Sequence, residues 1–213
     1  MPTFRESGLE FTFPDDWEVL PFDKHPYYRT LSGHGLSGVD FMALLPDGTL
    51  LLLEVKNYTD PYPDRNLVEL PKFVTDFDGY ARRMARKATD SLRTVRIVEQ
   101  MLLRKRGYRW LVNYPWWLQR LVPGWYWWYR AAHAAAAPAR IWFVLWAENP
   151  ESIGIYTVTD FAEWKQRLAV RVRSLLSDFI GRVDVCWLEF PPREDIRVVL
   201  SGFGKEPRSD TRA

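Results

Sequence analysis

Residues 38–58 read GVDFMALLPDGTLLLLEVKNY, and this stretch decides the fold that we expect for the chain. Two apolar runs meet at Pro46-Asp47-Gly48, which predicts a β-hairpin. Pro and Asp suit the central positions of a type I turn, and Gly suits the left-handed residue that closes a three-residue loop. A two-residue loop at Asp47-Gly48 would shift the strand pairing and turn every side chain to the other face. We favour the three-residue loop because it gives Pro46 a natural place.

The three-residue loop brings charged side chains together at one end of the hairpin. Its register places Asp40 opposite Glu54, and Lys56 projects to the same face as Glu54 because side chains alternate along a strand. Two opposed carboxylates repel and destabilise a sheet. A divalent cation would remove the conflict, and Mg²⁺ typically binds one or two carboxylates together with water and substrate phosphate. A strand-end ion pair between Glu54 and Lys56 is the alternative, but it does not explain Asp40.

Asp40 in "GVDF" and Glu54-Val55-Lys56 in "LLLEVKNY" resemble the motif of the PD-(D/E)xK nuclease superfamily, which has the restriction-endonuclease-like fold. The resemblance extends loosely to "ARRMARKATDSL", which is similar to a helix of uncharacterised bacterial members. It implies a hydrolase that cleaves phosphodiester bonds of nucleic acid, with DNA as the expected substrate. Asp40, Glu54 and the Val55 carbonyl would hold Mg²⁺ (or Mn²⁺), and Lys56 would orient the attacking water or stabilise the transition state.

The nuclease family usually carries a further acidic residue on a helix before this hairpin. No helical pattern is evident between Met1 and Gly38, where residues 9–13 and 17–22 alternate as short strands do. Of the acids in this region we choose Glu18, and then Glu10, as the additional acid of the site.

Composition predicts a single α/β domain. The chain has 213 residues, of which 47% are hydrophobic and 26% charged, as in ordinary globular proteins. A net charge of +2 means that any surface for nucleic acid must come from local clustering. The single cysteine, Cys186, excludes an internal disulfide and a cysteine zinc cluster. The N-terminus lacks the pattern of a signal peptide, so we expect a cytoplasmic protein.

The pattern from Asp76 to Arg106 predicts a long amphipathic helix, with Thr75 and Asp78 as a capping box. Off its apolar stripe lie basic residues that would suit a phosphate backbone: Arg82, Arg83, Arg86, Lys87 and Arg93. A solvated helix face explains these residues equally well. The resemblance makes Lys87 the one that would point back toward the site, and an ordinary surface lysine is the alternative.

Residues 108–138 form a Trp-rich insertion, with six of the chain's 11 tryptophans between Trp110 and Trp128. Arginines and prolines interrupt it, so we expect no transmembrane segment. Its aromatic residues could pack on the core, stack on unpaired bases, or contact a protein partner or membrane surface.

The remaining pattern completes a mixed β-sheet flanked by helices. Residues 141–146 form a continuous apolar run typical of a central strand, a helix is expected from Asp160 to Gly181 with Phe179 on its apolar stripe, and residues 184–190 form a last strand. After Tyr58, residues 59–71 either cover the site or simply cross the surface. We expect one nuclease-like α/β domain over residues 1–200 and a loose tail over 201–213.

Two functions from different classes compete. The first is a metal-dependent nuclease that uses Asp40, Glu54 and Lys56. The second is a catalytically inactive module of the same fold that binds nucleic acid or a protein partner through the basic helix and the insertion. A third interpretation, attachment to a membrane surface through residues 108–138, depends on the insertion alone.

Overall fold

The structure is a computed structural model that describes residues 1–58, 75–105, 123–148, 152–153, 156–188, 191–193 and 196–200. Its elements, in chain order, are β1 (Thr3–Glu6), β2 (Leu9–Thr12), β3 (Glu18–Pro21), α1 (Pro26–Ser32), β4 (Phe41–Leu44), β5 (Leu50–Asn57), α4 (Phe77–Arg104), α7 (Pro123–Ala135), the 3-10 helix η1 (Pro138–Arg140), β6 (Ile141–Glu148), β7 (Ser152–Ile153), β8 (Tyr156–Thr157), α8 (Val158–Leu176), β9 (Arg182–Cys186) and β10 (Arg197–Leu200). The predicted loop 59–71 and tail 201–213 lie outside the described residues.

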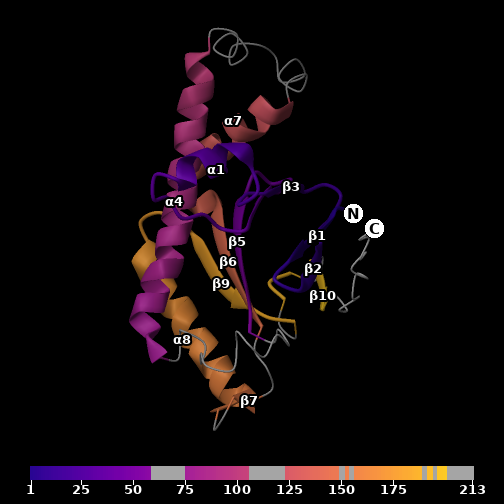
Figure 1. The fold of residues 1–213 in the computed structure, drawn as a ribbon, viewed down its shortest axis with the longest axis vertical. Helices are drawn as coiled ribbons and strands as arrows, with labels where there is room; N and C mark the ends of the chain where they lie inside the picture. Colours follow the sequence, from indigo (N-terminus) through magenta and orange to yellow (C-terminus); the bar gives the residue numbers. More distant parts are fainter. Residues whose placement is uncertain are drawn as a thin grey trace, which may run out of the picture.

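A five-stranded sheet with the order β3-β4-β5-β6-β9 forms the centre of the fold (Figure 1). β3, β4 and β5 pair antiparallel, whereas β5, β6 and β9 pair parallel, so the prediction of a mixed sheet is confirmed. Every residue of β6 is buried, as its continuous apolar run predicts for a strand covered on both faces.

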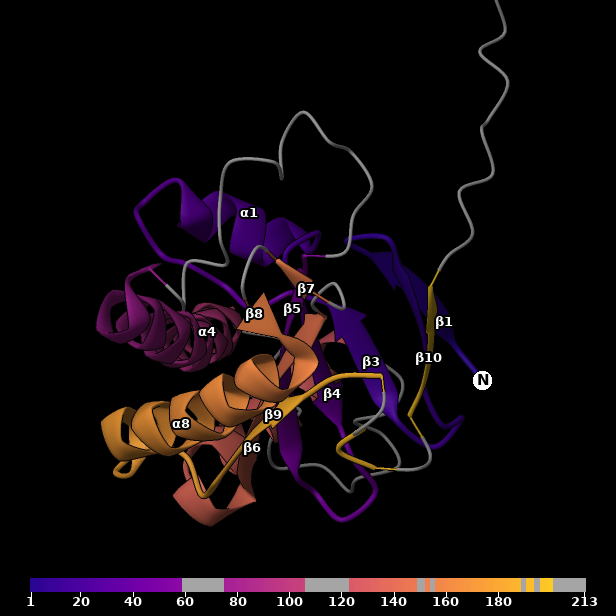
Figure 2. The same cartoon turned by 90° about the horizontal axis from the view of Figure 1, so that it is seen from below.

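The two faces of this sheet are covered differently (Figure 2). Alternate residues such as Met42 and Leu52 pack with α4, α7 and α8 in one core. Their neighbours, such as Phe41 and Leu53, pack in a second core with the strand β2. This strand belongs to a separate three-stranded sheet, β1-β2-β10, which the sequence did not predict. Helices therefore cover one face and a small sheet covers the other.

The hairpin has the predicted register. Phe41 pairs with Leu53 and Leu44 pairs with Leu50. The Gly48 N–H donates to the Leu45 carbonyl at 3.0 Å, and Gly48 has a φ of +81°, as the closing residue of a three-residue loop requires. This register directs Asp40, Glu54 and Lys56 to the face that carries the helices.

The helix α4 begins one residue later than predicted. Its N-cap is Asp76, whose Oδ1 accepts a hydrogen bond from the Gly79 N–H at 3.0 Å, so the predicted capping box of Thr75 and Asp78 is wrong. Asp78 already lies inside the first turn and pairs instead with Arg171 of α8 at 2.9 Å. The predicted apolar stripe is buried from Tyr80 onward.

The described part of the Trp-rich insertion packs into the core. Trp125, Trp127 and Trp128 of α7 are all buried, and the Trp127 indole N–H donates to the Glu18 carbonyl at 3.1 Å. For residues 123–138, the core-packing interpretation is therefore confirmed. Residues 108–122 lie outside the described part of the chain. Among the helices that the structure describes, none combines the length and apolar character that a membrane crossing requires.

The helix α8 and the strand β9 have other bounds than the sequence predicted. The helix α8 ends at Leu176, whose carbonyl accepts hydrogen bonds from the N–H groups of both Phe179 and Ile180 at 2.9 Å. This turn buries Ile180 and leaves Phe179 53% exposed, so Phe179 does not belong to the apolar stripe. The last strand of the sheet, β9, covers residues 182–186 rather than 184–190.

Candidate active site

The short segment before β4 is fixed from two sides. The Tyr28 hydroxyl of α1 accepts a hydrogen bond from the Gly38 N–H at 2.8 Å, and the Ser91 hydroxyl of α4 accepts one from the Val39 N–H at 3.0 Å. A Cβ atom on Gly38 would lie 2.5 Å from the Tyr28 ring, so only glycine permits this approach. These contacts set the position of Asp40, which follows directly.

Asp40 is anchored to β5 by its backbone and its side chain. Its N–H donates to the Leu53 carbonyl at 3.1 Å, and its Oδ2 accepts a hydrogen bond from the Val55 N–H at 2.6 Å. Burial and the nearby Glu54 carboxylate raise the pKa of Asp40 to about 7. The hydrogen bond from Val55 and two nearby lysines lower this pKa only in part.

Glu54 carries the unusual contacts of the site. Its side chain is 0% exposed, and its Oε1 lies 2.6 Å from the Nζ atoms of both Lys56 and Lys87. Its Oε2 is buried and has no hydrogen-bond partner among the described residues. Buried carboxylate oxygens are costly unless they are paired, so this oxygen has unused capacity for a ligand.

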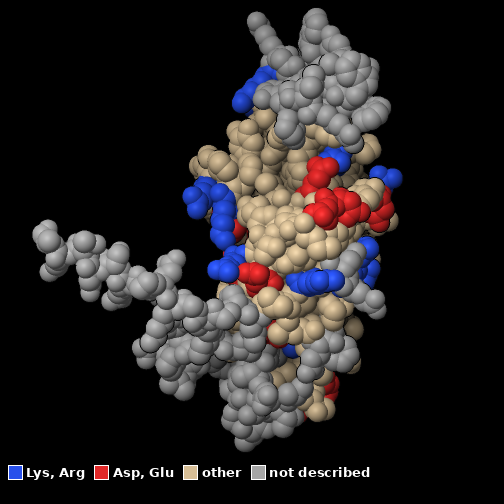
Figure 3. Space-filling model, turned by 90° about the vertical axis from the view of Figure 1, so that its right-hand side faces the viewer, with Lys and Arg blue, Asp and Glu red and all other residues tan. Residues whose placement is uncertain are grey.

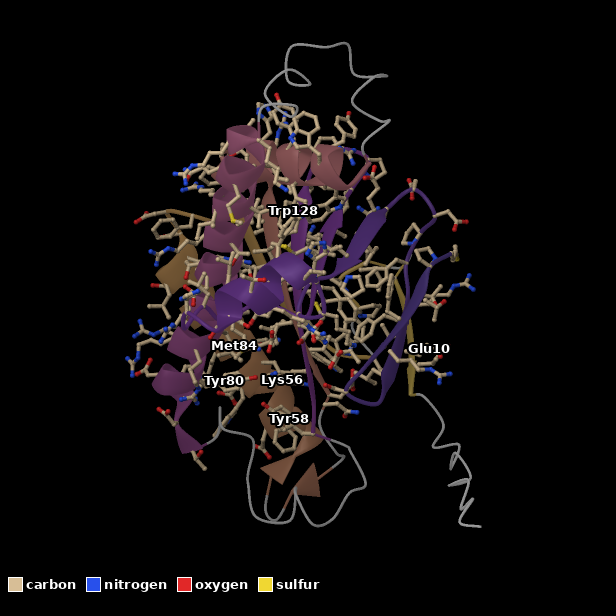
Figure 4. All side chains as sticks on the ribbon, turned by 45° about the horizontal axis from the view of Figure 1, so that its top comes forward. Glu10, Lys56, Tyr58, Tyr80, Met84 and Trp128 are labelled. Carbon is tan, nitrogen blue, oxygen red and sulfur yellow. The ribbon has the colours of Figure 1, made fainter. Side chains whose placement is uncertain are left out.

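Lys56 remains a cation in this environment. Burial lowers the pKa of Lys56, but the attraction of Glu54, the hydrogen bond to Glu54 and the attraction of Asp40 outweigh it, so the pKa lies above its ordinary value. Two tyrosines lie beside Lys56, and the Tyr58 hydroxyl donates a hydrogen bond to the Tyr80 hydroxyl at 3.1 Å. Figure 4 shows Lys56, Tyr58 and Tyr80 grouped toward one end of the sheet.

The donor set fits a hard divalent cation with few protein ligands. Within the described residues, no group of three or more His, Cys, Asp or Glu side chains is arranged to hold a metal ion. Two carboxylates, Asp40 and Glu54, meet at the site, and one oxygen of Glu54 has no partner in the described segments. Mg²⁺ commonly binds one or two carboxylates and keeps several waters, so these residues fit Mg²⁺ or Mn²⁺.

The additional acids predicted from the sequence do not reach the site. Glu18 pairs with Leu44 across β3 and β4, at the loop end of the hairpin, and forms an ion pair with Arg130. Glu18 also lines a pocket of about 480 Å³ beside the hairpin loop, at the opposite end from Glu54. Glu10 belongs to β2 of the small sheet, where it binds Arg5 at 2.9 Å (Figure 4). Both assignments are therefore wrong, because the strands that carry these acids lead elsewhere.

The predicted basic residues of α4 separate into two groups. Lys87 points into the site, whereas Arg83 binds Asp76 at 3.1 Å and Arg86 binds Asp90 at 3.4 Å. Arg82 and Arg93 are exposed. Figure 3 shows the side of the molecule that faces away from α4, and its described part carries acidic and basic side chains close together rather than a patch of one charge.

The helix α1 and the half-buried acid Asp23 before it were not predicted from the sequence. Pro26 is the first residue of α1, and a proline at this position is a recognised sign of a helix start. The residue before it, His25, caps the helix: its Nδ1 accepts a hydrogen bond from the Tyr27 N–H at 3.3 Å. Asp23 lies beside the site, with its N–H 3.5 Å from the Asp40 carbonyl, and its Oδ1 is buried with no hydrogen-bond partner in the described ranges. Burial, followed by the nearby Glu6, raises the pKa of Asp23.

Comparisons with models of protein families, with curated proteins and with solved structures found no match for this chain.

Proposed function

We propose that this chain is a metal-dependent nuclease of the PD-(D/E)xK superfamily, with a restriction-endonuclease-like fold, that hydrolyses phosphodiester bonds at Asp40, Glu54 and Lys56. The observation that carries the proposal is Glu54, a fully buried carboxylate with two ammonium groups on one oxygen and, within the described part of the chain, no partner on the other. An unsatisfied buried polar group costs roughly 1–3 kcal/mol, so this arrangement needs a reason beyond folding.

Asp40 and Glu54, with the Val55 carbonyl, would hold Mg²⁺ or Mn²⁺. A cation held there would lower the pKa of a bound water molecule and would neutralise charge on the phosphate. Lys56 keeps its proton on Nζ. Because Lys56 extends from the packed strand β5, its ammonium is held in place to donate to a phosphate oxygen or to orient the attacking water. Asp40 accepts the Val55 N–H through Oδ2, which fixes the orientation of its carboxylate.

The proposed substrate is nucleic acid, with DNA favoured. The exposed Arg82 and Arg93 provide cations on α4, the helix that also carries Lys87 into the site. Such residues would bind the phosphate backbone without reading its sequence.

One observation favours a second function, an inactive module that binds nucleic acid or a protein partner. The described residues do not bring a third acid into contact with Asp40 and Glu54, and the predicted candidates Glu18 and Glu10 lie elsewhere. In this case Lys56 and Lys87 would serve only as ion-pair partners of Glu54.

Cleavage of labelled single-stranded, double-stranded and branched DNA, and of RNA, separates the two functions. The wild type would be compared with Glu54→Ala in Mg²⁺ and in Mn²⁺, with Glu163→Ala as a control because Glu163 is an exposed acid on α8. We expect cleavage by the wild type and the control and none by Glu54→Ala. Binding without cleavage by all three proteins would favour the inactive module.

A further inference from the structure

Two lysines from different elements compete for one oxygen. Lys56 comes from β5, two residues after Glu54, whereas Lys87 reaches the same Oε1 from α4, and each Nζ lies 2.6 Å from it. One ammonium group is enough to neutralise one carboxylate. The second is therefore available for another role when the charge of the site changes.

Lys87 faces both the buried acid and the solvent. Its side chain is 26% exposed, while Glu54 is 0% exposed, so the ammonium lies at the boundary between the carboxylate and open space. On the same helix face, Met84 lies one turn before Lys87 and is buried in the core, and Tyr80 lies two turns before it and contacts Tyr58. The aliphatic stem of Lys87 can therefore stay packed while its ammonium turns outward.

We infer that Lys87 neutralises Glu54 in the metal-free protein through Oε1, and that its ammonium turns to a phosphate group of the substrate when a divalent cation binds. This inference depends on the proposed function, since it assumes that Glu54 is a metal ligand. Like charges at close range repel, so an ammonium beside the same carboxylate weakens metal binding. Lys56, which extends from the packed strand β5, keeps its position.

In this role Lys87 weakens metal binding and strengthens substrate binding. In the absence of metal its ammonium neutralises the buried Glu54 carboxylate, and in the presence of metal it adds a positive charge beside the phosphate. A lysine that serves only to stabilise the fold would do neither. The two roles predict opposite effects of one substitution on metal affinity and on cleavage.

The test is Mn²⁺ binding by isothermal titration calorimetry at fixed pH, for the wild type and for Lys87→Met. We expect Mn²⁺ to bind about tenfold more tightly to Lys87→Met, the order expected for removing one repulsive charge near a partly exposed site. Cleavage by this variant should fall, with a higher KM for DNA. Lys87→Arg keeps the charge and should keep the wild-type Mn²⁺ affinity, and Arg93→Met, an exposed cation of the same helix, should change neither Mn²⁺ affinity nor folding.

The outcomes separate this inference from the proposed function. Unchanged or weaker Mn²⁺ binding by a folded Lys87→Met protein, with clear binding by the wild type, would overturn the role of Lys87 alone. Absence of Mn²⁺ binding by both proteins would overturn the metal site and the inference together. Thermal unfolding of each variant in EDTA establishes that the proteins compared are folded.

Discussion

The two ends of the β4–β5 hairpin differ in whether their polar groups have hydrogen-bond partners. At the loop end, the Leu45 N–H donates to the Thr49 carbonyl at 2.9 Å, and the Thr49 N–H donates to the Asp47 Oδ1 at 2.9 Å. The hydrogen bond from the Thr49 backbone is the main reason why the pKa of Asp47 lies below its usual value. Each of these groups is satisfied by a local partner.

At the other end, the same two strands hold charges that the fold does not satisfy. Asp40 has a pKa of about 7 because it is buried near Glu54, and no residue that the structure describes forms a hydrogen bond with the Oε2 of Glu54. One hairpin therefore has an end built for stability and an end that costs stability. Strained or unsatisfied groups of this kind are found at functional sites. Substitutions at the charged end should therefore affect activity, and substitutions at the loop end should affect only stability.

The largest effect is expected for Lys56→Ala at the charged end. Removing a pre-placed cation from the developing negative charge typically costs on the order of 10²–10³-fold in kcat. The fold should survive, because Lys87 still pairs with Glu54. Single-turnover cleavage kinetics measure the effect, and Asp47→Ala at the loop end is the control. Full activity of Lys56→Ala would remove the proposed mechanism.

A second effect, on stability, is expected for Asp40→Asn in metal-free buffer. The raised pKa of Asp40 means that the folded protein favours the neutral carboxyl. This contribution is complete below the unfolded pKa near 4 and is lost as the pH rises through about 7. Asn stays neutral and can still accept the Val55 N–H, so the variant should be the more stable protein at pH 8, by up to a few kcal/mol.

Thermal unfolding in EDTA between pH 5 and pH 8 measures this difference. The advantage of Asp40→Asn over the wild type should be greatest at pH 8 and should shrink toward pH 5. A variant that is less stable than the wild type at pH 8 would show that ionised Asp40 stabilises the fold, contrary to the contrast between the two ends.

A smaller effect is expected for Gly48→Ala at the loop end. Gly48 has a φ of +81°, and this conformation costs an L-residue with a Cβ atom roughly 1–2 kcal/mol. The free energy of unfolding, measured with urea, should fall by this amount. The rate of cleavage at saturating metal and substrate should not change, since the loop lies at the far end of the strands from Glu54. A matched loss of activity would argue against separate roles for the two ends.

The smallest effect is expected for Asp47→Ala, which removes the side-chain acceptor of the Thr49 N–H. A partly exposed hydrogen bond of this kind contributes about 1 kcal/mol. The urea midpoint should fall slightly and the slope of the transition should not change. A change in slope would indicate that the loop controls more of the fold than its own end.

The hairpin could be predicted from sequence because its information is local. Pro46-Asp47-Gly48 fixes the loop, the loop fixes the register, and the register places Asp40 near Glu54. The burial of β6 follows from its composition in the same way. The contact of Lys87 with Glu54 was suggested by the helix resemblance, and the spacing of the helix alone would not have selected it.

The rest depended on contacts between distant parts of the chain. The pairing of β2 with β10 joins residues 9–12 to residues 197–200, and no local pattern reveals it. This pairing removes Glu10 from the site, and the direction of β3 does the same for Glu18. The half-buried Asp23 lies in the turn that leads into α1, a helix of seven residues that is too short to produce a clear periodic pattern.

The most direct test of the central claim is the anomalous scattering of manganese in crystals of the wild-type protein grown with saturating Mn²⁺. We expect a peak in contact with Asp40 and with the Oε2 of Glu54, and no peak at this place in Asp40→Asn crystals grown in the same way. A wild-type map without a peak there, with Lys56 and Lys87 still on Glu54, would contradict the metal site and leave these charges as a structural ion-pair cluster.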